Sequence, residues 1–97
     1  MTGEKPSLGE TSEARLKRMS MRSWRRGTKE MDLVLGPWSD ANLAQLDEAR
    51  LSLYDTLLAE NDQDLMAWLL GQTPAPAPLA GFLAEICDFA KARLRGA

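Results

Sequence analysis

Residues 39–58 read SDANLAQLDEARLSLYDTLL and carry the clearest helical pattern of the chain. Ser39 is a favourable N-cap residue, and apolar residues recur behind it at the three- and four-residue spacing of one helix face. We therefore predict one long helix that begins at Ser39 and ends near Asn61-Asp62. Its apolar face comprises Leu43, Leu46, Leu53, Tyr54, Leu57 and Leu58, while Asp47, Glu48 and Asp55 face outward.

The residues after Asn61-Asp62 predict a short helix that Gly71 ends, and its apolar side chains imply burial on most sides. We expect this helix to be central. Alternate prolines then favour an extended connector over residues 73–78, which we interpret as a linker, the alternative being a polyproline ligand. A last helix begins at Leu79. The apolar residues of these two helices are Leu65, Met66, Trp68, Leu69 and Leu70, then Phe82, Leu83, Ile86, Phe89, Ala90 and Leu94.

Two helices precede residue 39. Thr11 or Ser12 can cap the first, which ends at Trp24, and Thr28 can cap a short second helix over residues 28–35. The pair Gly36-Pro37 is expected to stop that helix. Residues 1–10 contain glycine and proline and little to bury, so we expect a flexible N-terminal tail followed by a single helical domain over residues 11–97.

The fold class that follows is all-α, because no segment shows the alternation of a strand. Short connections favour antiparallel neighbours, which gives a compact five-helix bundle with a short second helix. Of the 97 residues, 44% are hydrophobic, which is enough for a folded core.

Charge is distributed unevenly along the chain. Residues 15–29 carry seven basic side chains and no acid, whereas residues 30–88 carry eleven acids and one base. The sign therefore reverses at Arg26-Gly27-Thr28-Lys29-Glu30. Such a boundary suits docking to another protein better than it suits chemistry.

The residue inventory argues against an enzyme. The chain has no histidine, and its one cysteine, Cys87, lies in an apolar stretch that we interpret as part of the core. A single cysteine allows no internal disulfide, so we expect the protein in a reducing compartment. Glu60, Asp62 and Asp64 lack the glycine turn of a calcium loop, and we interpret them as a solvated helix end. No glycine-rich phosphate loop is present. We therefore expect no catalytic residue, no metal site and no cofactor bound by this chain.

Binding to nucleic acid or to a membrane is also disfavoured. The basic stretch contains Trp24, yet the acidic remainder of the chain would repel a polyanion. Leu16, Met19 and Trp24 make too small an apolar face for membrane adsorption, and no run approaches the ~20 apolar residues of a spanning helix. We expect a cytosolic protein, since the first residues lack a secretory signal and contain acids that a mitochondrial presequence avoids.

Two runs of sequence, taken together, indicate a family. Residues 21–32 read MRSWRRGTKEMD and residues 62–69 read DQDLMAWL. In order and spacing they resemble the small FAD assembly factors of succinate dehydrogenase, whose hallmark is Arg-Gly-x-x-Glu. The resemblance covers about residues 12–95. It implies a five-helix protein that binds the flavoprotein subunit of succinate dehydrogenase, and in some bacteria of fumarate reductase.

The function that the resemblance implies is promotion of covalent FAD attachment to a histidine of that subunit. The accepting histidine and the FAD then belong to the partner, and the free factor is expected to be a monomer in the bacterial cytoplasm. The motif falls on Arg26, Gly27 and Glu30, with Trp24 and Asp32 beside it. The residues that we expect to bind the partner are Arg26, Gly27, Glu30, Trp24, Asp32, Arg22 and Arg25.

The residues also allow a physical hypothesis for the motif. Gly27 would let the backbone approach the partner, Arg26 would donate hydrogen bonds to it, and Glu30 would orient Arg26 or accept from the partner. The alternative is that Arg26 and Glu30 form only a surface pair four residues apart. An antitoxin-like or other small regulatory protein remains the alternative function.

Overall fold

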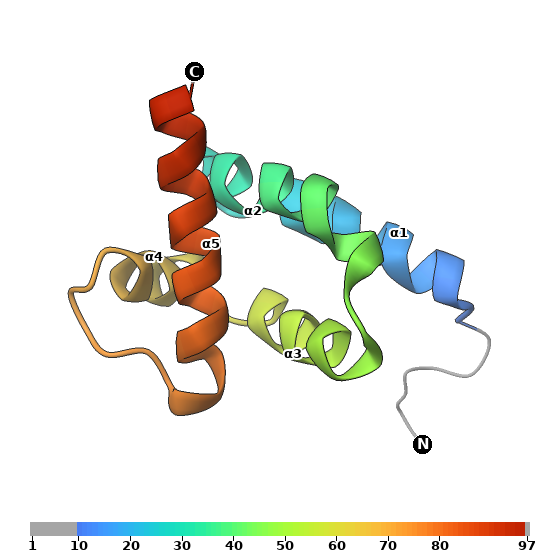
Figure 1. The fold of residues 1–97 in the computed structure, drawn as a ribbon. Coiled ribbons are helices and arrows are strands. Elements are labelled where there is room, and N and C mark those ends of the chain that lie inside the picture. The colour runs from blue at the N-terminus through green and yellow to red at the C-terminus, as the bar shows by residue number, and fades with distance from the viewer. Residues whose placement is uncertain (1–9, 97) are drawn as a thin grey trace.

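The computed structural model describes residues 10–96, which form an all-α fold, as the sequence predicts. The described residues contain five α-helices and one 3₁₀ turn and no strand. α1 and α2 pack against each other, α3 lies beneath them, and α5 crosses the group beside α4 (Figure 1). The elements are α1 Ser12–Trp24, α2 Lys29–Asn42, η1 Leu43–Gln45, α3 Glu48–Leu58, α4 Asp62–Leu69 and α5 Ala77–Gly96. Residues 1–9, most of the predicted tail, lie outside the described residues.

The core centres on three aromatic side chains from three helices. The Trp38 ring of α2 lies 4.9 Å from that of Tyr54 in α3 and 5.1 Å from that of Phe82 in α5, between centroids. The Tyr54 hydroxyl is 2.7 Å from Ser23 Oγ, which itself donates to the Met19 carbonyl oxygen. Burial raises the pKa of Tyr54 to about 12. α1 is thus attached to the aromatic centre by a buried polar contact.

The second helix is not short. α2 continues to Asn42, through the Gly36-Pro37 pair that we expected to stop it. An interior proline removes one helical hydrogen bond, but continuing the helix past Pro37 buries Trp38 in the core. Ser39, expected to begin the next helix, lies inside α2 and donates from Oγ to the Gly36 carbonyl oxygen at 2.7 Å. Tertiary burial therefore outweighs the local stop signal.

The long helix predicted from Ser39 is also interrupted. The chain turns through η1, and α3 begins at Glu48 with Asp47 as its N-cap, since Asp47 Oδ1 accepts from the backbone N–H of Arg50 at 2.9 Å. Asp47 and Glu48 are exposed, as expected. They lie at the start of α3 and not in the middle of the long helix that we predicted. The leucine spacing continues across the turn, which is why the break leaves little trace in the pattern.

The helix that we expected to be central is peripheral. In α4 only Leu65 is fully buried, and Leu70, just after the helix, is 62% exposed. A run of apolar residues on all sides of a short helix predicts burial but does not fix how many neighbours cover it. Gly71 ends α4 as predicted, at φ 76°, and the N–H of Gln72 donates to the Ala67 carbonyl oxygen at 2.9 Å.

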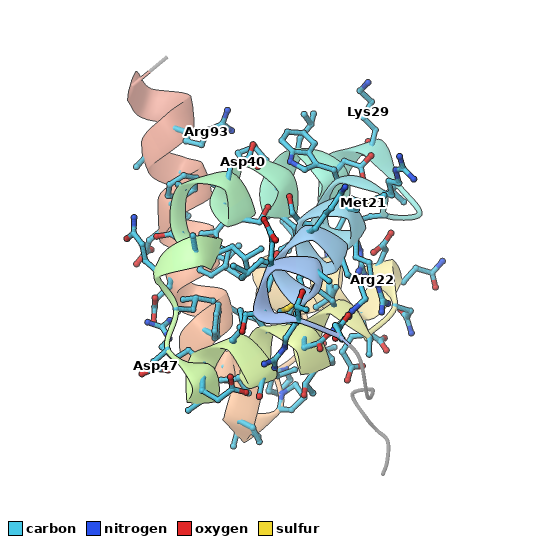
Figure 2. All side chains as sticks on the ribbon, turned by 90° about the vertical axis from the view of Figure 1, so that its right-hand side faces the viewer. Met21, Arg22, Lys29, Asp40, Asp47 and Arg93 are labelled. Atoms are coloured by element: carbon cyan, nitrogen blue, oxygen red, sulfur yellow. The ribbon has the colours of Figure 1, made fainter. Side chains whose placement is uncertain are left out.

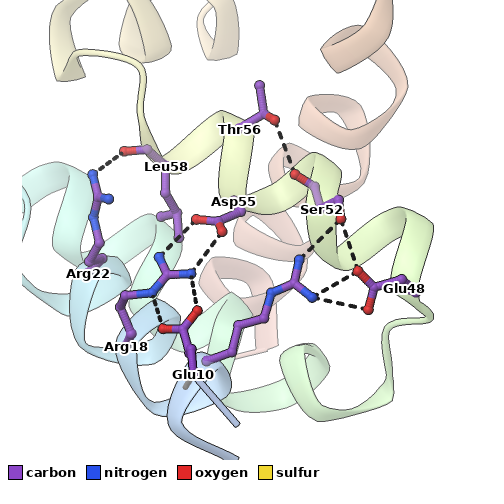
Figure 3. A network of polar contacts seen from close by, with 9 residues as sticks. Glu10, Arg18, Arg22, Glu48, Ser52, Asp55, Thr56 and Leu58 are labelled. Carbon is purple, nitrogen blue, oxygen red and sulfur yellow. Dashed lines mark hydrogen bonds and ion pairs between the residues drawn. The ribbon is translucent and has the colours of Figure 1, made fainter. Parts of the chain in front are cut away.

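Much of the basic charge of α1 is paired within the molecule. A guanidinium nitrogen of Arg15 lies 2.8 Å from a carboxylate oxygen of Glu48 (Figure 3). The guanidinium of Arg18 lies between two carboxylates, with nitrogen–oxygen distances of 2.9 Å to Asp55 and 2.7 Å to Glu10. The contacts with Glu48 and Asp55 join α1 to α3. The basic and acidic segments of the sequence therefore attract each other along this side of the bundle, and only part of the positive charge of residues 15–29 remains for a partner.

Candidate functional site

The Arg-Gly-x-x-Glu motif spans the turn between α1 and α2. Thr28 caps α2, as predicted, because its Oγ1 accepts from the backbone N–H of Met31 at 3.2 Å. The backbone N–H of Arg26 donates to Asp32 Oδ1 at 2.6 Å. Asp32 therefore closes the turn onto the first turn of α2.

Asp62, the first residue of α4, fixes the same turn from the other side. Its Oδ1 accepts from Arg26 Nε at 2.8 Å, and its Oδ2 accepts from the backbone N–H groups of Gly27 and Thr28, the latter at 3.1 Å. The side chains of Arg26 and Asp62 are only 7% and 11% exposed. Several hydrogen bonds to a buried charge offset the cost of removing that charge from water. We call this arrangement the Asp62 clamp.

Arg26 makes its contacts inside the chain. Besides Asp62, its guanidinium donates to the carbonyl oxygens of Leu58 at 2.8 Å and Glu60 at 2.7 Å, at the C-terminal end of α3. Carbonyl groups at a helix C-terminus attract a cation. We expected Arg26 to donate hydrogen bonds to a partner, but its guanidinium donates to Asp62, Leu58 and Glu60 of this chain. The alternative, a surface pair of Arg26 with Glu30, is not formed either.

Gly27 is the residue that makes the clamp geometrically feasible. A Cβ at this position would lie 2.9 Å from Asp62 Oδ2, closer than van der Waals contact allows. We expected Gly27 to let the backbone approach the partner, but the group that approaches it here is Asp62 of the same chain. The glycine backbone is otherwise exposed.

Trp24 packs across α2. A Cβ added at Gly36 would overlap the Trp24 ring, so the indole lies directly on the α2 backbone. Trp24 Nε1 donates to Asp40 Oδ1 at 3.2 Å, yet the side chain keeps 39% of its surface exposed. Trp24 thus joins the motif turn to α2 and still presents part of its ring outside.

The outward side of the site carries exposed basic side chains. Arg25 and Lys29 are exposed and make no ion pair with another described residue, whereas Arg22 donates to the Leu58 carbonyl oxygen at 3.1 Å. Met21, 41% exposed, lies among these residues. Figure 2 shows Met21 and Arg22 on α1 and Lys29 projecting from the start of α2.

Asp62 is the site residue that sequence reasoning misjudged. We interpreted it with Glu60 and Asp64 as a solvated helix end, but its side chain is almost fully covered. The signal was present in the sequence, because both runs that suggested the family contain a member of the clamp. Within residues 10–96, no group of three acidic, cysteine or histidine side chains is placed to hold a metal ion.

Comparison with known proteins identifies the family. The model of the family described as flavinator of succinate dehydrogenase matches residues 17–90. This chain belongs to that family. The match includes the motif turn, Glu30 and the Asp62 clamp, and it confirms the resemblance seen in the sequence.

Relatives of the flavinator family occur in bacteria and in fungi. FAD assembly factor SdhE of Legionella pneumophila is 45% identical over 66 residues, which cover 66% of this chain and 84% of that protein. FAD assembly factor SdhE of Haemophilus ducreyi is 34% identical over 61 residues, covering 63% and 74%. The mitochondrial succinate dehydrogenase assembly factor 2 of Mycosarcoma maydis is 35% identical over 68 residues, which cover 70% of this chain but 29% of that longer protein.

Proposed function

We propose that this protein is a non-catalytic assembly factor that binds the flavoprotein subunit of succinate dehydrogenase and promotes covalent attachment of FAD to it. Family membership supports the client and the outcome. The Asp62 clamp is the structural observation that supports the docking site, because it holds the motif turn in one conformation before any partner arrives. A preorganised surface loses less entropy on binding.

In this proposal the bond between FAD and protein is formed within the partner. This chain has no histidine to accept flavin and no glycine-rich phosphate loop. FAD supplies the bond-forming chemistry in the flavoprotein subunit, and we propose that this chain binds no FAD of its own. Its contribution is to stabilise a partner conformation in which flavin and the accepting histidine are aligned.

The seven expected residues divide into two roles in this proposal. Arg26, Gly27 and Asp32 shape the turn, since their polar groups bond within the chain. Glu30 and the exposed part of Trp24, with Arg25 and Arg22, contact the partner. The flavoprotein subunit of fumarate reductase is proposed as a second client, and the free factor as a monomer in the bacterial cytoplasm. Within residues 10–96, no helix is both long and apolar enough to cross a membrane.

Co-expression tests the proposal. A succinate dehydrogenase flavoprotein subunit is produced in cells lacking their own factor, with or without this protein, and covalent flavin is measured as fluorescence of the subunit on a denaturing gel. We expect a fluorescent band that depends on this protein and that Glu30→Ala and Gly27→Arg weaken. Asp88→Asn, a change at an exposed position on α5, should leave the band unchanged. Equal fluorescence with and without the factor would refute the function.

A further inference from the structure

A groove lies beside the motif turn, between the starts of α2 and α4. Its volume is ≈ 400 Å³. Thr28 and Glu30 line it at the start of α2, Asp62, Gln63, Met66 and Ala67 line it from α4, and Gln72 lines it from the turn after α4. The groove is thus built mainly by the two segments that carry the family motifs, and the Asp62 clamp fixes their relative position.

Only one of the two carboxylates in the groove lacks a counter-charge. Asp62 is bound to Arg26 and to two backbone N–H groups, and its side chain is 11% exposed. Glu30 is exposed, and its carboxylate makes no hydrogen bond or ion pair with another residue of the described range. The rim therefore presents one negative charge that is available to a ligand.

The groove wall beside this charge is apolar. Met66 and Ala67 are half-buried, so their surfaces form a strip that water still reaches. A lysine or arginine side chain combines an aliphatic stem with a charged head, and such side chains bury the stem on apolar surface while the head stays at a polar group. The groove matches that shape of ligand.

We infer that this groove receives a lysine or arginine side chain of the flavoprotein subunit, with its stem along Met66 and Ala67 and its head at Glu30. The inference rests on the proposed function, since it names what that partner inserts. A charge-assisted hydrogen bond to Glu30 would fix the register of docking as well as adding affinity. Glu30 therefore binds the partner directly and does not orient Arg26.

The test is the affinity of the purified factor for the purified flavoprotein subunit lacking covalent flavin, measured by calorimetry at low and high salt. Loss of a hydrogen bond to a charged group should weaken binding of Glu30→Gln by about tenfold to hundredfold. The variant should also show a smaller dependence on salt than wild type. Asp88→Asn removes one negative charge outside the groove and should bind as wild type does.

A second variant separates the charge from the shape of the groove. Ala67→Phe fills the groove beside Met66, and circular dichroism and thermal unfolding verify that the helices remain intact. We expect Ala67→Phe to weaken binding as well. If only Ala67→Phe weakens binding, the occupant is an uncharged side chain and the inference is wrong.

Two further results would separate failure of this inference from failure of the proposed function. If both variants bind as wild type does while flavin attachment still depends on the factor, the groove lies outside the interface and the inference fails alone. If the wild-type factor neither binds the subunit nor promotes flavin attachment, the proposed function fails. Zero-length carbodiimide coupling of Glu30 to a partner amine would distinguish lysine, which couples, from arginine, which does not.

Discussion

Asp62 connects two segments that lie 35 positions apart in the sequence, and one carboxylate satisfies both a buried arginine and two backbone N–H groups. At the scale of single residues, the family motif therefore does two things. Arg26 and Gly27 shape the turn from within, and Glu30 remains available outside. The fold bonds Arg26 and Gly27 within the chain and leaves Glu30 exposed, so Glu30 is the one of the three that we propose contacts the partner.

The first residue-scale prediction concerns the clamp. Asp62→Ala leaves Arg26 buried without its carboxylate, and removal of one partner from a buried ion pair costs about 3 kcal/mol or more. Urea unfolding should show this loss in the free energy of unfolding. Asp64→Ala is the matched control, because Asp64 is exposed and two positions further along α4. Equal losses for the two variants would show that Asp62 has no special structural role.

A second residue-scale prediction concerns close packing of Trp24 on α2. Gly36→Ala places a methyl group inside the indole ring, so the ring must move, and overpacking of this kind costs about 1–3 kcal/mol. Gly81→Ala is the same chemical change within α5, where nothing lies within 4 Å of the added Cβ. That variant should gain up to about 1 kcal/mol from helix propensity. Thermal unfolding of the pair measures the difference, which would vanish if Trp24 did not rest on Gly36.

At the scale of elements, α1 is held to α3 by ion pairs as well as by the core. The Arg18 guanidinium, which donates hydrogen bonds to Asp55, lowers the pKa of that carboxyl below its ordinary value of 3.8. Hydrogen bonds from Arg15 likewise lower the pKa of Glu48. The charge reversal along the sequence thus serves the contact between these two helices, while Arg25 and Lys29 stay exposed with no ion pair to another described residue.

The element-scale prediction follows from the sign of these shifts. Asp55 has a lower pKa in the folded state, so its contribution to stability is present above its ordinary pKa and is lost as pH falls through the folded value. Asp55→Asn should therefore flatten the loss of stability between about pH 5 and pH 2, as measured by urea unfolding at each pH. Asp88→Asn should keep the wild-type profile. An unchanged profile for Asp55→Asn would mean that Arg18 does not stabilise the folded state through this carboxyl.

At the scale of the whole molecule, the sequence predicted the helical class and most helix starts, because capping residues such as Thr11 and Thr28 act locally. It could not predict that α2 passes through Pro37, since that depends on burial of Trp38 against Tyr54 and Phe82. The length of α2 and the exposure of α4 differ most from the predictions made from sequence. Both depend on long-range contacts.

The candidate site was likewise predicted from the sequence only in part. The motif residues were located from the sequence, and Gly27 was expected to let the backbone approach the partner, whereas the group that lies against it is Asp62 of the same chain. The group that approaches it could not be known, because Asp62 reaches the turn only through the packing of α4. The groove beside Glu30 exists for the same reason, since one wall comes from each segment.

The central claim, that this protein promotes covalent flavin attachment in a partner, is tested most directly with purified components. The flavoprotein subunit lacking covalent flavin is incubated with FAD, with or without this protein, and covalent flavin is followed over time by in-gel fluorescence. We expect faster attachment with the wild-type protein, little acceleration with Glu30→Gln, and covalent flavin on the subunit but not on this protein. Attachment at the same rate with and without this protein would refute the proposed function.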